Sequence, residues 1–300
     1  MTQGLAEPGP IVVGVERSDR SRDALALART LARTLHTRLI LVAVHPGEVR
    51  SGVMALEAEA ALERVAGPMG GVRAESRVVA CNSVHHGLQQ VADAESALVV
   101  VVGSSHRGPV GRIAPGSVGE RLLHAASCPV AVAPRGYSGH AFAGIQRVGV
   151  GYTTGPEAGE ALSAAVGLAV RTGAALRLLS VVEPPPVAVA LPLGWGLGEL
   201  EATERADLAH QIERAIEDVA APVELSGEVV DGYADDELAR LSQEVDLLIC
   251  GSRGHGRDGN VTLGNASTGL LRKAECPVLI VPRGAREGLA ALRAPAADPV

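Results

Sequence analysis

The sequence repeats itself, and this internal repeat restricts the possible folds more than any other feature. Residues 11–44 match residues 148–181 at a constant separation of 137 positions. Residues 103–136 match residues 251–284 at a separation of 148 positions. Self-similarity over blocks of this length indicates a duplicated structural unit. We therefore predict that the chain folds as two tandem copies of one domain.

The ends of the matching blocks predict the domain boundaries. The first domain covers residues 1–136, a linker covers residues 137–146, and the second domain covers residues 147–284. The second copy is longer because residues are inserted between its two blocks, and loops absorb such insertions readily. Residues 285–300 are rich in alanine and proline, and we expect them to form a flexible tail.

Short apolar runs alternate with longer stretches of helical spacing in both copies. The four valines at residues 99–102 and the segment LLIC at residues 247–250 are typical of strands buried on both faces of a parallel sheet. The predicted strands are Ile11–Val15, Leu39–Val44, Ser76–Val79, Leu98–Val102 and Val130–Ala133, then Val148–Tyr152, Leu176–Val181, Glu228–Val230, Leu247–Cys250 and Val278–Val281. The predicted helices of the first copy are Ser21–Leu35, Ala55–Ala66, Val84–Ala94 and Ser117–Ala126.

This alternation of strands and helices predicts an α/β fold. Each copy should form a doubly wound domain in which a five-stranded, mostly parallel sheet is flanked by helices, as in Rossmann-like or flavodoxin-like folds. In such domains ligands bind in the crevice outside the carboxyl ends of the strands. We therefore look for functional residues where the predicted strands end.

Composition and charge exclude several classes of protein. The apolar share of 47% and the charged share of 20% are those of an ordered globular chain. The net charge is -7 and the basic residues are scattered, which disfavours nucleic acid and an anionic membrane surface as partners. No apolar run approaches the roughly 18 residues that span a membrane, and the amino terminus lacks the pattern of a signal peptide. We therefore expect a cytoplasmic protein.

The cysteines and histidines do not form a metal or redox motif. The pair His85-His86 and the nearby His106 have no further ligand at a suitable spacing. The four cysteines are far apart, and no pair has the CxxC spacing of a zinc or thiol redox site. We expect no metal site and no redox cofactor. We interpret the cysteines as small buried apolar residues: Cys81, Cys128, Cys250 and Cys276.

A glycine-rich loop follows the fourth predicted strand of the second copy. Gly251 and Gly254 are followed, after nine residues, by Gly264 at the start of a predicted helix. Glycines allow sharp turns that expose backbone N–H groups, and a helix N-terminus carries about half a positive charge, so this segment can bind an anion. The pattern G-x2-G-x9-G-(S/T/N), followed by a helix and by CPVLIVP, resembles the universal stress protein family.

The resemblance covers both copies, about residues 10–135 and 146–284, and corresponds to the tandem form of the family. It implies a sensor or regulator of the stress response that binds ATP or a related adenine nucleotide, alone or with Mg²⁺. Nucleotide-binding members hold the phosphates with this loop, and they use an acid after the first strand and a backbone contact at the end of the second. In the second copy the corresponding residues are Thr153 at the acid position, Val181 for the adenine, and Gly251, Gly254, Gly264, Asn265 and Ser267 for the phosphates. Arg253 can neutralise phosphate charge, although a solvated polar loop has the same sequence.

The first copy matches the family pattern in a different way. Glu16 stands at the acid position, Val44 at the adenine position, and Gly103, Gly116 and Ser117 in the loop, but His106 replaces the second glycine. A side chain there crowds a phosphate or demands a backbone angle that only glycine adopts easily. The threonine at position 153 of the second copy weakens only one hydrogen bond. We therefore favour the second copy as the nucleotide site.

The same residues also have interpretations without a ligand. Ser117-x-x-Glu120 has the sequence of a capping box and Asn265 that of an ordinary N-cap, and both occur at helix starts in any protein. An alternative function is a ligand-free interaction module in which domains or subunits pair through the last strands, at residues 130–134 and 278–282. Its candidate partners are a second copy of the chain or a regulatory protein.

Enzymatic activity has no support in the sequence. We find no nucleophile, base and orienting group at plausible spacing, no Walker GxxxxGK[ST] motif and no paired acids near a cleft. We therefore assign no catalytic residue and do not expect an enzyme. Slow hydrolysis of ATP, by groups that the sequence does not identify, is the third alternative.

Overall fold

The computed structural model describes residues 8–16, 20–47, 51–65, 70–104, 110–113, 116–139, 144–153, 155–184, 197–252 and 264–282. Arg253 and Gly254 of the predicted phosphate loop, His106 and the predicted tail at residues 285–300 lie outside these ranges.

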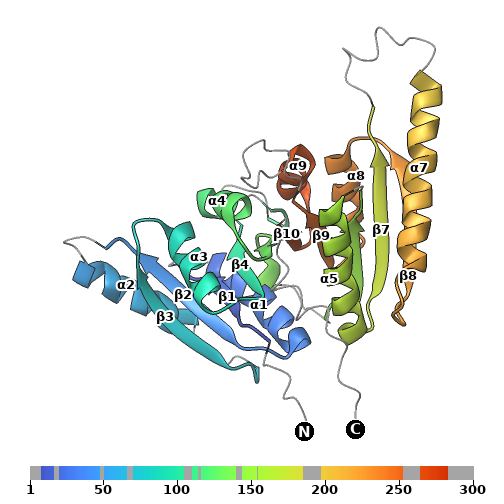
Figure 1. Cartoon of the computed structure of the whole chain (residues 1–300). Coiled ribbons are helices and arrows are strands. Elements are labelled where there is room, and N and C mark those ends of the chain that lie inside the picture. Colours follow the sequence, from blue (N-terminus) through green and yellow to red (C-terminus); the bar gives the residue numbers. More distant parts are fainter. Residues whose placement is uncertain are drawn as a thin grey trace, which may run out of the picture.

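Strands and helices alternate along the first half of the chain, as Figure 1 shows in blue to green. The elements are β1 (Ile11–Gly14), α1 (Arg20–Leu35), β2 (Leu39–His45), α2 (Ser51–Val65), β3 (Ala74–Ala80), α3 (Val84–Ala94), β4 (Val99–Gly103), α4 (Ser117–Ala125) and β5 (Val130–Ala133).

The second half repeats this order after a short 3-10 helix, η1 (Tyr137–Gly139). Its elements are β6 (Arg147–Gly151), α5 (Pro156–Thr172), β7 (Ala175–Val182), α7 (Leu197–Glu217), β8 (Leu225–Asp231), α8 (Ala234–Leu241), β9 (Leu247–Gly251), α9 (Asn265–Lys273) and β10 (Val278–Val281). The exact limits of the two predicted domains stay a prediction, because the element order does not fix them.

The described strands form one ten-stranded sheet in the order β3-β2-β1-β4-β5-β10-β9-β6-β7-β8. Strands are parallel within each half, and the order in each half is that of a Rossmann-like fold, not a flavodoxin-like one. The predicted fold class is confirmed. At the centre β5 and β10 pair antiparallel, with Val132 opposite Val278. This confirms the prediction that the two domains pair through their last strands.

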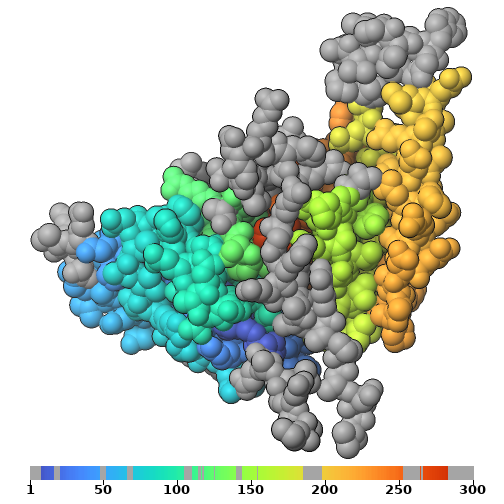
Figure 2. Space-filling view, in the orientation of Figure 1, coloured from blue at the N-terminus to red at the C-terminus, as the bar shows by residue number. Residues whose placement is uncertain are grey.

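Two hydrophobic cores lie on opposite faces of the sheet. Because side chains alternate along a strand, Val13 points into one core and its neighbour Val12 into the other. Helices α1, α2, α5 and α7 cover the first face, and α3, α4, α8 and α9 cover the second. In the space-filling view of Figure 2, α7 forms the outer margin of the second half.

The two outer strands are longer than their apolar segments predicted. β3 covers Ala74–Ala80 instead of Ser76–Val79, and β8 covers Leu225–Asp231 instead of Glu228–Val230. Both lie at the margins of the sheet, where many of their side chains are exposed and polar. A strand at an edge needs no continuous apolar run. The apolar pattern of the sequence therefore predicted only the inner part of each edge strand.

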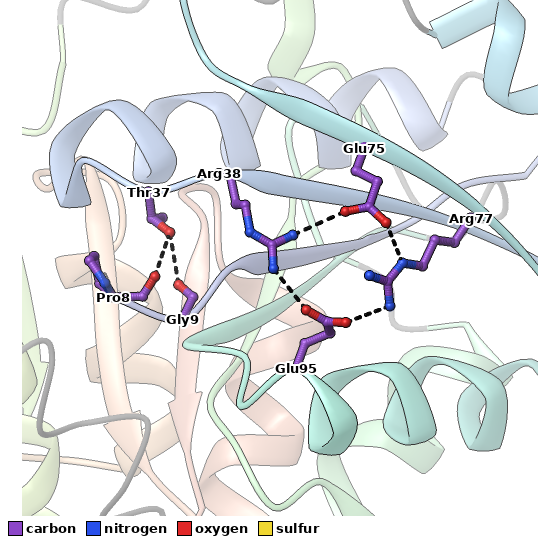
Figure 3. A network of polar contacts seen from close by, with 7 residues as sticks. All are labelled: Pro8, Gly9, Thr37, Arg38, Glu75, Arg77 and Glu95. Atoms are coloured by element: carbon purple, nitrogen blue, oxygen red, sulfur yellow. Dashed lines mark hydrogen bonds and ion pairs between the residues drawn. The ribbon is translucent and has the colours of Figure 1, made fainter. Parts of the chain in front are cut away.

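Four charged side chains form a network at the amino-terminal ends of β2 and β3 (Figure 3). Arg38 contacts Glu75 at 3.3 Å and Glu95 at 2.8 Å, measured between nitrogen and oxygen. Arg77 closes the network with Glu75 at 2.7 Å and Glu95 at 2.6 Å. These charges therefore lie at the edge of the sheet opposite the carboxyl ends of the strands.

Candidate functional site

The candidate sites lie where strand order reverses in each half. In the second half β6 lies between β7 and β9. The chain leaves β7 toward one face of the sheet and β9 toward the other, which opens a crevice at the carboxyl ends of the strands. Thr153 follows β6, Val181 lies near the end of β7, and Gly251 ends β9. Gly264 stands directly before α9. The structure thus places these four predicted residues at one edge of the sheet.

The first half has the same arrangement. Glu16 follows β1, Val44 lies near the end of β2, Gly103 ends β4, and Gly116 and Ser117 lie at the start of α4. The Ser21 hydroxyl locks the chain after β1, because it accepts the backbone N–H of Glu16 at 2.7 Å and donates to the Glu16 carbonyl at 2.9 Å. Alanine occupies the equivalent position in the second half, and its side chain cannot form these two hydrogen bonds.

Both helices at the candidate phosphate sites are preceded by a glycine at the N-cap position. Gly116 and Gly264 are the N-caps, and their carbonyls accept the backbone N–H groups of Glu120 and Thr268 at 2.9 Å. Ser117 and Asn265 are therefore the first helical residues. The capping box at Ser117 and the N-cap role of Asn265 are wrong, because each helix starts one residue earlier than those interpretations require.

The conformation of these two glycines does not explain their presence. Gly116 has φ −79° and ψ 171°, and Gly264 has φ −65° and ψ 159°. Every residue type adopts such extended angles. The backbone conformation therefore does not require glycine at either helix start.

Gly251 has a structural reason to be glycine. A Cβ atom at this position would lie 2.9 Å from both the Cβ atom and the carbonyl oxygen of Glu157, in the first turn of α5. Such contacts are too short for real side chains. The close packing of α5 against the end of β9 therefore accounts for this glycine without any ligand, and it brings the acidic residue Glu157 to the candidate site.

Two serines are buried beside the phosphate end of the second site. The hydroxyl of Ser267, in the first turn of α9, lies 3.5 Å from the Gly251 carbonyl, at the limit of a hydrogen bond. Ser252 is fully buried, and its hydroxyl has no hydrogen-bond partner within the described ranges. Its equivalent Ser104 donates to the Arg112 carbonyl at 3.4 Å. The Ser252 hydroxyl therefore has an unmet hydrogen-bonding capacity next to the site.

The two predicted adenine positions share one environment. Val44 and Val181 are half-buried and pack against the core beneath α3 and α8. A Cβ atom on Gly87 of α3 would lie 2.9 Å from the Val44 methyl groups, so the helix approaches this strand end closely. The side chains face the core, which leaves backbone groups to meet a ligand at these positions.

Burial keeps three of the cysteines in the thiol form. Burial raises the pKa of Cys128 and of Cys250 to about 12, and it raises the pKa of Cys276 further. These three residues are buried as predicted. Cys81 is only half-buried, so the prediction is wrong for this residue, which follows the exposed end of the edge strand β3.

Among the described residues there is no group of three or more histidine, cysteine or acidic side chains that could hold a metal ion. His85 and His86 stack with their ring centres 5.8 Å apart. No helix within the described part of the chain is long and apolar enough to cross a membrane.

Sequence reasoning did not identify Ser252 or Glu157 as site residues. Ser252 carried a signal, because the pair Gly251-Ser252 repeats Gly103-Ser104. Glu157 carried none, because its equivalent in the first copy is Arg20 and only the packing of α5 on β9 brings it to the site.

Comparison with known proteins identifies the family. The sequence matches the universal stress protein family twice, over residues 8–134 and 144–282. The Mycobacterium tuberculosis H37Rv protein named universal stress protein Rv2319c is 28% identical over 245 residues, which are 78% of this chain and 80% of that protein.

A solved structure extends the comparison to the fold. A universal stress protein from Archaeoglobus fulgidus DSM 4304 covers 92% of this chain and 98% of its own, with a TM-score of 0.67 and 19% identity. Another from Archaeoglobus fulgidus, determined in complex with dAMP, covers 42% of this chain and 98% of its own, with a TM-score of 0.37 and 25% identity. Because the two family matches span nearly the whole sequence, the chain belongs to the universal stress protein family, in its tandem form.

Proposed function

We propose that this chain binds ATP or a related adenine nucleotide, alone or with Mg²⁺, in its second half, and that it acts in the cytoplasm as a sensor or regulator of the stress response. The nucleotide would lie across the carboxyl ends of β6 and β9, with its phosphates at the start of α9. The residues of this site are Thr153, Val181, Gly251, Arg253, Gly254, Gly264, Asn265 and Ser267, and those of the weaker first site are Glu16, Val44, Gly103, Gly116 and Ser117.

The observation that carries this proposal is the glycine at the N-cap of α9. Serine, threonine, asparagine and aspartate at this position bond the N–H groups of the first turn. Gly264 has no side chain with which to do so, and its φ of −65° does not require glycine. The first-turn N–H groups, at the positive end of the helix dipole, can therefore meet a phosphate directly.

Ser252 supports the same location independently. A buried hydroxyl without a partner costs about 1–3 kcal/mol. Ser252 lies directly after Gly251 and has this property among the described residues. A phosphate oxygen, or a water molecule held by the phosphate, would supply the missing partner.

A matched pair of substitutions tests the proposal. Gly264→Val and Gly116→Val place the same side chain at equivalent N-caps whose backbone angles accept valine. Titration calorimetry with MgATP is expected to detect one site in the unmodified chain. Gly264→Val should weaken binding at least about a hundredfold, which is about 2.7 kcal/mol, whereas Gly116→Val should change it less than about threefold.

The outcomes separate the alternatives. Loss of binding only in Gly116→Val would move the site to the first half. Absence of heat and of co-purified nucleotide in the unmodified chain would overturn the proposal and favour the interaction module. That module can no longer use the last strands between subunits, because β5 and β10 pair within the chain. Release of phosphate under turnover conditions would instead favour the slow ATPase.

A further inference from the structure

The loop between β4 and α4 of the first half contacts the helix that starts at the second site. The backbone N–H of Ile113 donates to the Ala274 carbonyl at 3.1 Å. Ala274 is the C-cap of α9. The last carbonyls of a helix have no partner within the helix itself, so a residue of the first half satisfies the carboxyl end of α9.

Side-chain packing joins the same two segments. Ile113 is fully buried and belongs to the same core as Leu270 of α9. Next to it, Arg112 lies 3.5 Å from Glu275, measured from Nη2 to Oε1. This pair is exposed and contributes little to stability, but it aligns the loop with the turn that follows α9.

The loop segment that makes these contacts is itself fixed. The carbonyl of Arg112 accepts the backbone N–H of Arg135 at 3.1 Å, and Gly111 donates to the Arg135 carbonyl at 2.8 Å. Arg135 follows β5, the strand that pairs with β10. Residues 111–113 therefore bridge the central strand pair and the carboxyl end of α9.

The second half contributes further contacts at the same end of α9. The backbone N–H of Glu275 donates to the Ser242 hydroxyl at 3.0 Å, and its carboxylate accepts a hydrogen bond from Gln243 at 3.2 Å. Lys273 contacts Asp235 of α8 at 2.6 Å. The carboxyl end of α9 is thus held by α8 on one side and by the first half on the other.

We propose that Arg112 and Ile113 of the first half are positioning residues for the nucleotide site of the second half. Helix α9 has nine residues and is about 13 Å long, so a shift at its carboxyl end moves its amino end as well. By fixing the carboxyl end, the bridge holds the first-turn N–H groups where they meet a phosphate. This inference rests on the proposed function of the site.

The ion pair between Arg112 and Glu275 has no equivalent that would link the second half to the first site. The positions equivalent to Arg112 and Glu275 are Asn260 and Ser127, so no ion pair can form in the opposite sense. The Ser127 hydroxyl instead contacts Asp93 at 2.5 Å and accepts a hydrogen bond from Gln89 at 2.6 Å. The ion pair that links the first half to the carboxyl end of α9 therefore has no counterpart at the first site.

Three variants and a rescue test this inference by titration with MgATP. Ile113→Ala is expected to weaken binding about tenfold, and Arg112→Glu about threefold to fivefold. Combining Arg112→Glu with Glu275→Arg should restore the affinity to within about twofold, because the exchanged charges can pair again. Leu98→Ala, in the core on the opposite face, is the control for lost stability and should leave the affinity unchanged.

The melting temperature of each variant without nucleotide is measured in parallel. If Ile113→Ala fails to fold, Ile113→Val and Arg112→Glu carry the test. Equal affinities for the unmodified chain, Ile113→Ala and Arg112→Glu would overturn the inference and leave the proposed function standing. A loss in Leu98→Ala as large as that in Ile113→Ala, or no rescue by the double exchange, would also overturn it. If the unmodified chain binds no nucleotide, the proposed function fails first and the inference fails with it.

Discussion

Asp23 in α1 holds Ser138 of η1 through two hydrogen bonds to one carboxylate oxygen. Its Oδ1 atom accepts the backbone N–H of Ser138 at 2.9 Å and the Ser138 hydroxyl at 2.8 Å. Its Oδ2 atom accepts the backbone N–H of Gly136 at 2.8 Å. Asp23 is only 5% exposed. A buried carboxylate thus fastens the start of the predicted linker to the first half.

Removing this charge should destabilise the protein. We expect Asp23→Asn to lower the free energy of unfolding by about 1–3 kcal/mol, because hydrogen bonds to a buried charge are stronger than those to a neutral amide. Urea denaturation followed by circular dichroism measures the change. A loss below about 0.5 kcal/mol, within the range of ordinary surface substitutions, would contradict a structural role for these bonds.

A substitution at the equivalent position in the second half should not lower the free energy of unfolding. Glu160 corresponds to Asp23, but its Oε2 atom is buried without a hydrogen-bond partner among the described residues. A buried, unpaired carboxylate oxygen is unfavourable. We expect Glu160→Gln to leave the free energy of unfolding unchanged or to raise it by up to about 1 kcal/mol. The same urea experiment compares it with Asp23→Asn, and equal losses in both variants would contradict the difference between the halves.

Thiol reactivity should distinguish Cys81 from the other cysteines. Burial raises the pKa of Cys128 and Cys250 to about 12, so almost none of either thiol is ionised at pH 8. Cys276 is buried in the same way, whereas Cys81 is half-buried. In the native protein, a chromogenic disulfide reagent should modify Cys81 rapidly and the other three only after unfolding. Rapid modification of a second thiol, identified by peptide mass, would contradict the burial of that residue.

The charged network in Figure 3 should contribute stability at neutral pH and lose it in acid. Hydrogen bonds from Arg38 and Arg77 lower the pKa of Glu95 in the folded protein. A carboxyl with a lowered folded pKa stabilises the fold above its unfolded pKa of about 4.3, and this stabilisation disappears as the pH falls through the folded value.

The variant Glu95→Gln should therefore be less stable than the unmodified protein at pH 7, by at most about 1 kcal/mol because the pairs are partly exposed. The difference should shrink toward pH 3 and in high salt, where charges are screened. Unfolding curves at the two pH values and at two salt concentrations measure it. A difference that grows on acidification would contradict the assignment.

The repeat and the continuous apolar strands made the fold predictable. Neighbouring residues such as Val12 and Val13 face opposite sides of the sheet, and both are apolar because helices cover both sides of a parallel sheet. The edge strand β3 was less predictable, since Glu75 and Arg77 form part of the ion-pair network and interrupt its apolar pattern. An apolar pattern indicates which residues are buried, and the residues of an edge strand are only partly buried.

The candidate site was predictable only where it depends on motif and strand order. Gly264 and Gly251 could be located because they repeat Gly116 and Gly103 at a fixed separation. The contact of Ile113 with Ala274 could not, because it depends on how the two halves meet across β5 and β10. Pairings between distant segments leave no local pattern in the sequence.

The carboxylate of Glu157 should weaken the binding of free ATP. Its Cβ atom lies beside Gly251 and its Oε2 atom beside Gly155, the N-cap of α5, so its charge lies at the same edge of the sheet as the proposed phosphate position. Like charges repel, and Mg²⁺ reduces the charge of the nucleotide. We expect Glu157→Gln to increase the affinity for ATP about threefold to tenfold without Mg²⁺, and less than about twofold with it.

Calorimetry at constant ionic strength, with and without Mg²⁺, measures both affinities. The exposed residue Glu217 at the end of α7 supplies the matched control, and Glu217→Gln should change neither value. A weaker binding of ATP by Glu157→Gln would reverse the interpretation. In that case Glu157 contacts the nucleotide and supplies, from the first turn of α5, the carboxylate that the threonine at position 153 lacks. An equal gain with and without Mg²⁺ would instead exclude a charge effect on the phosphates.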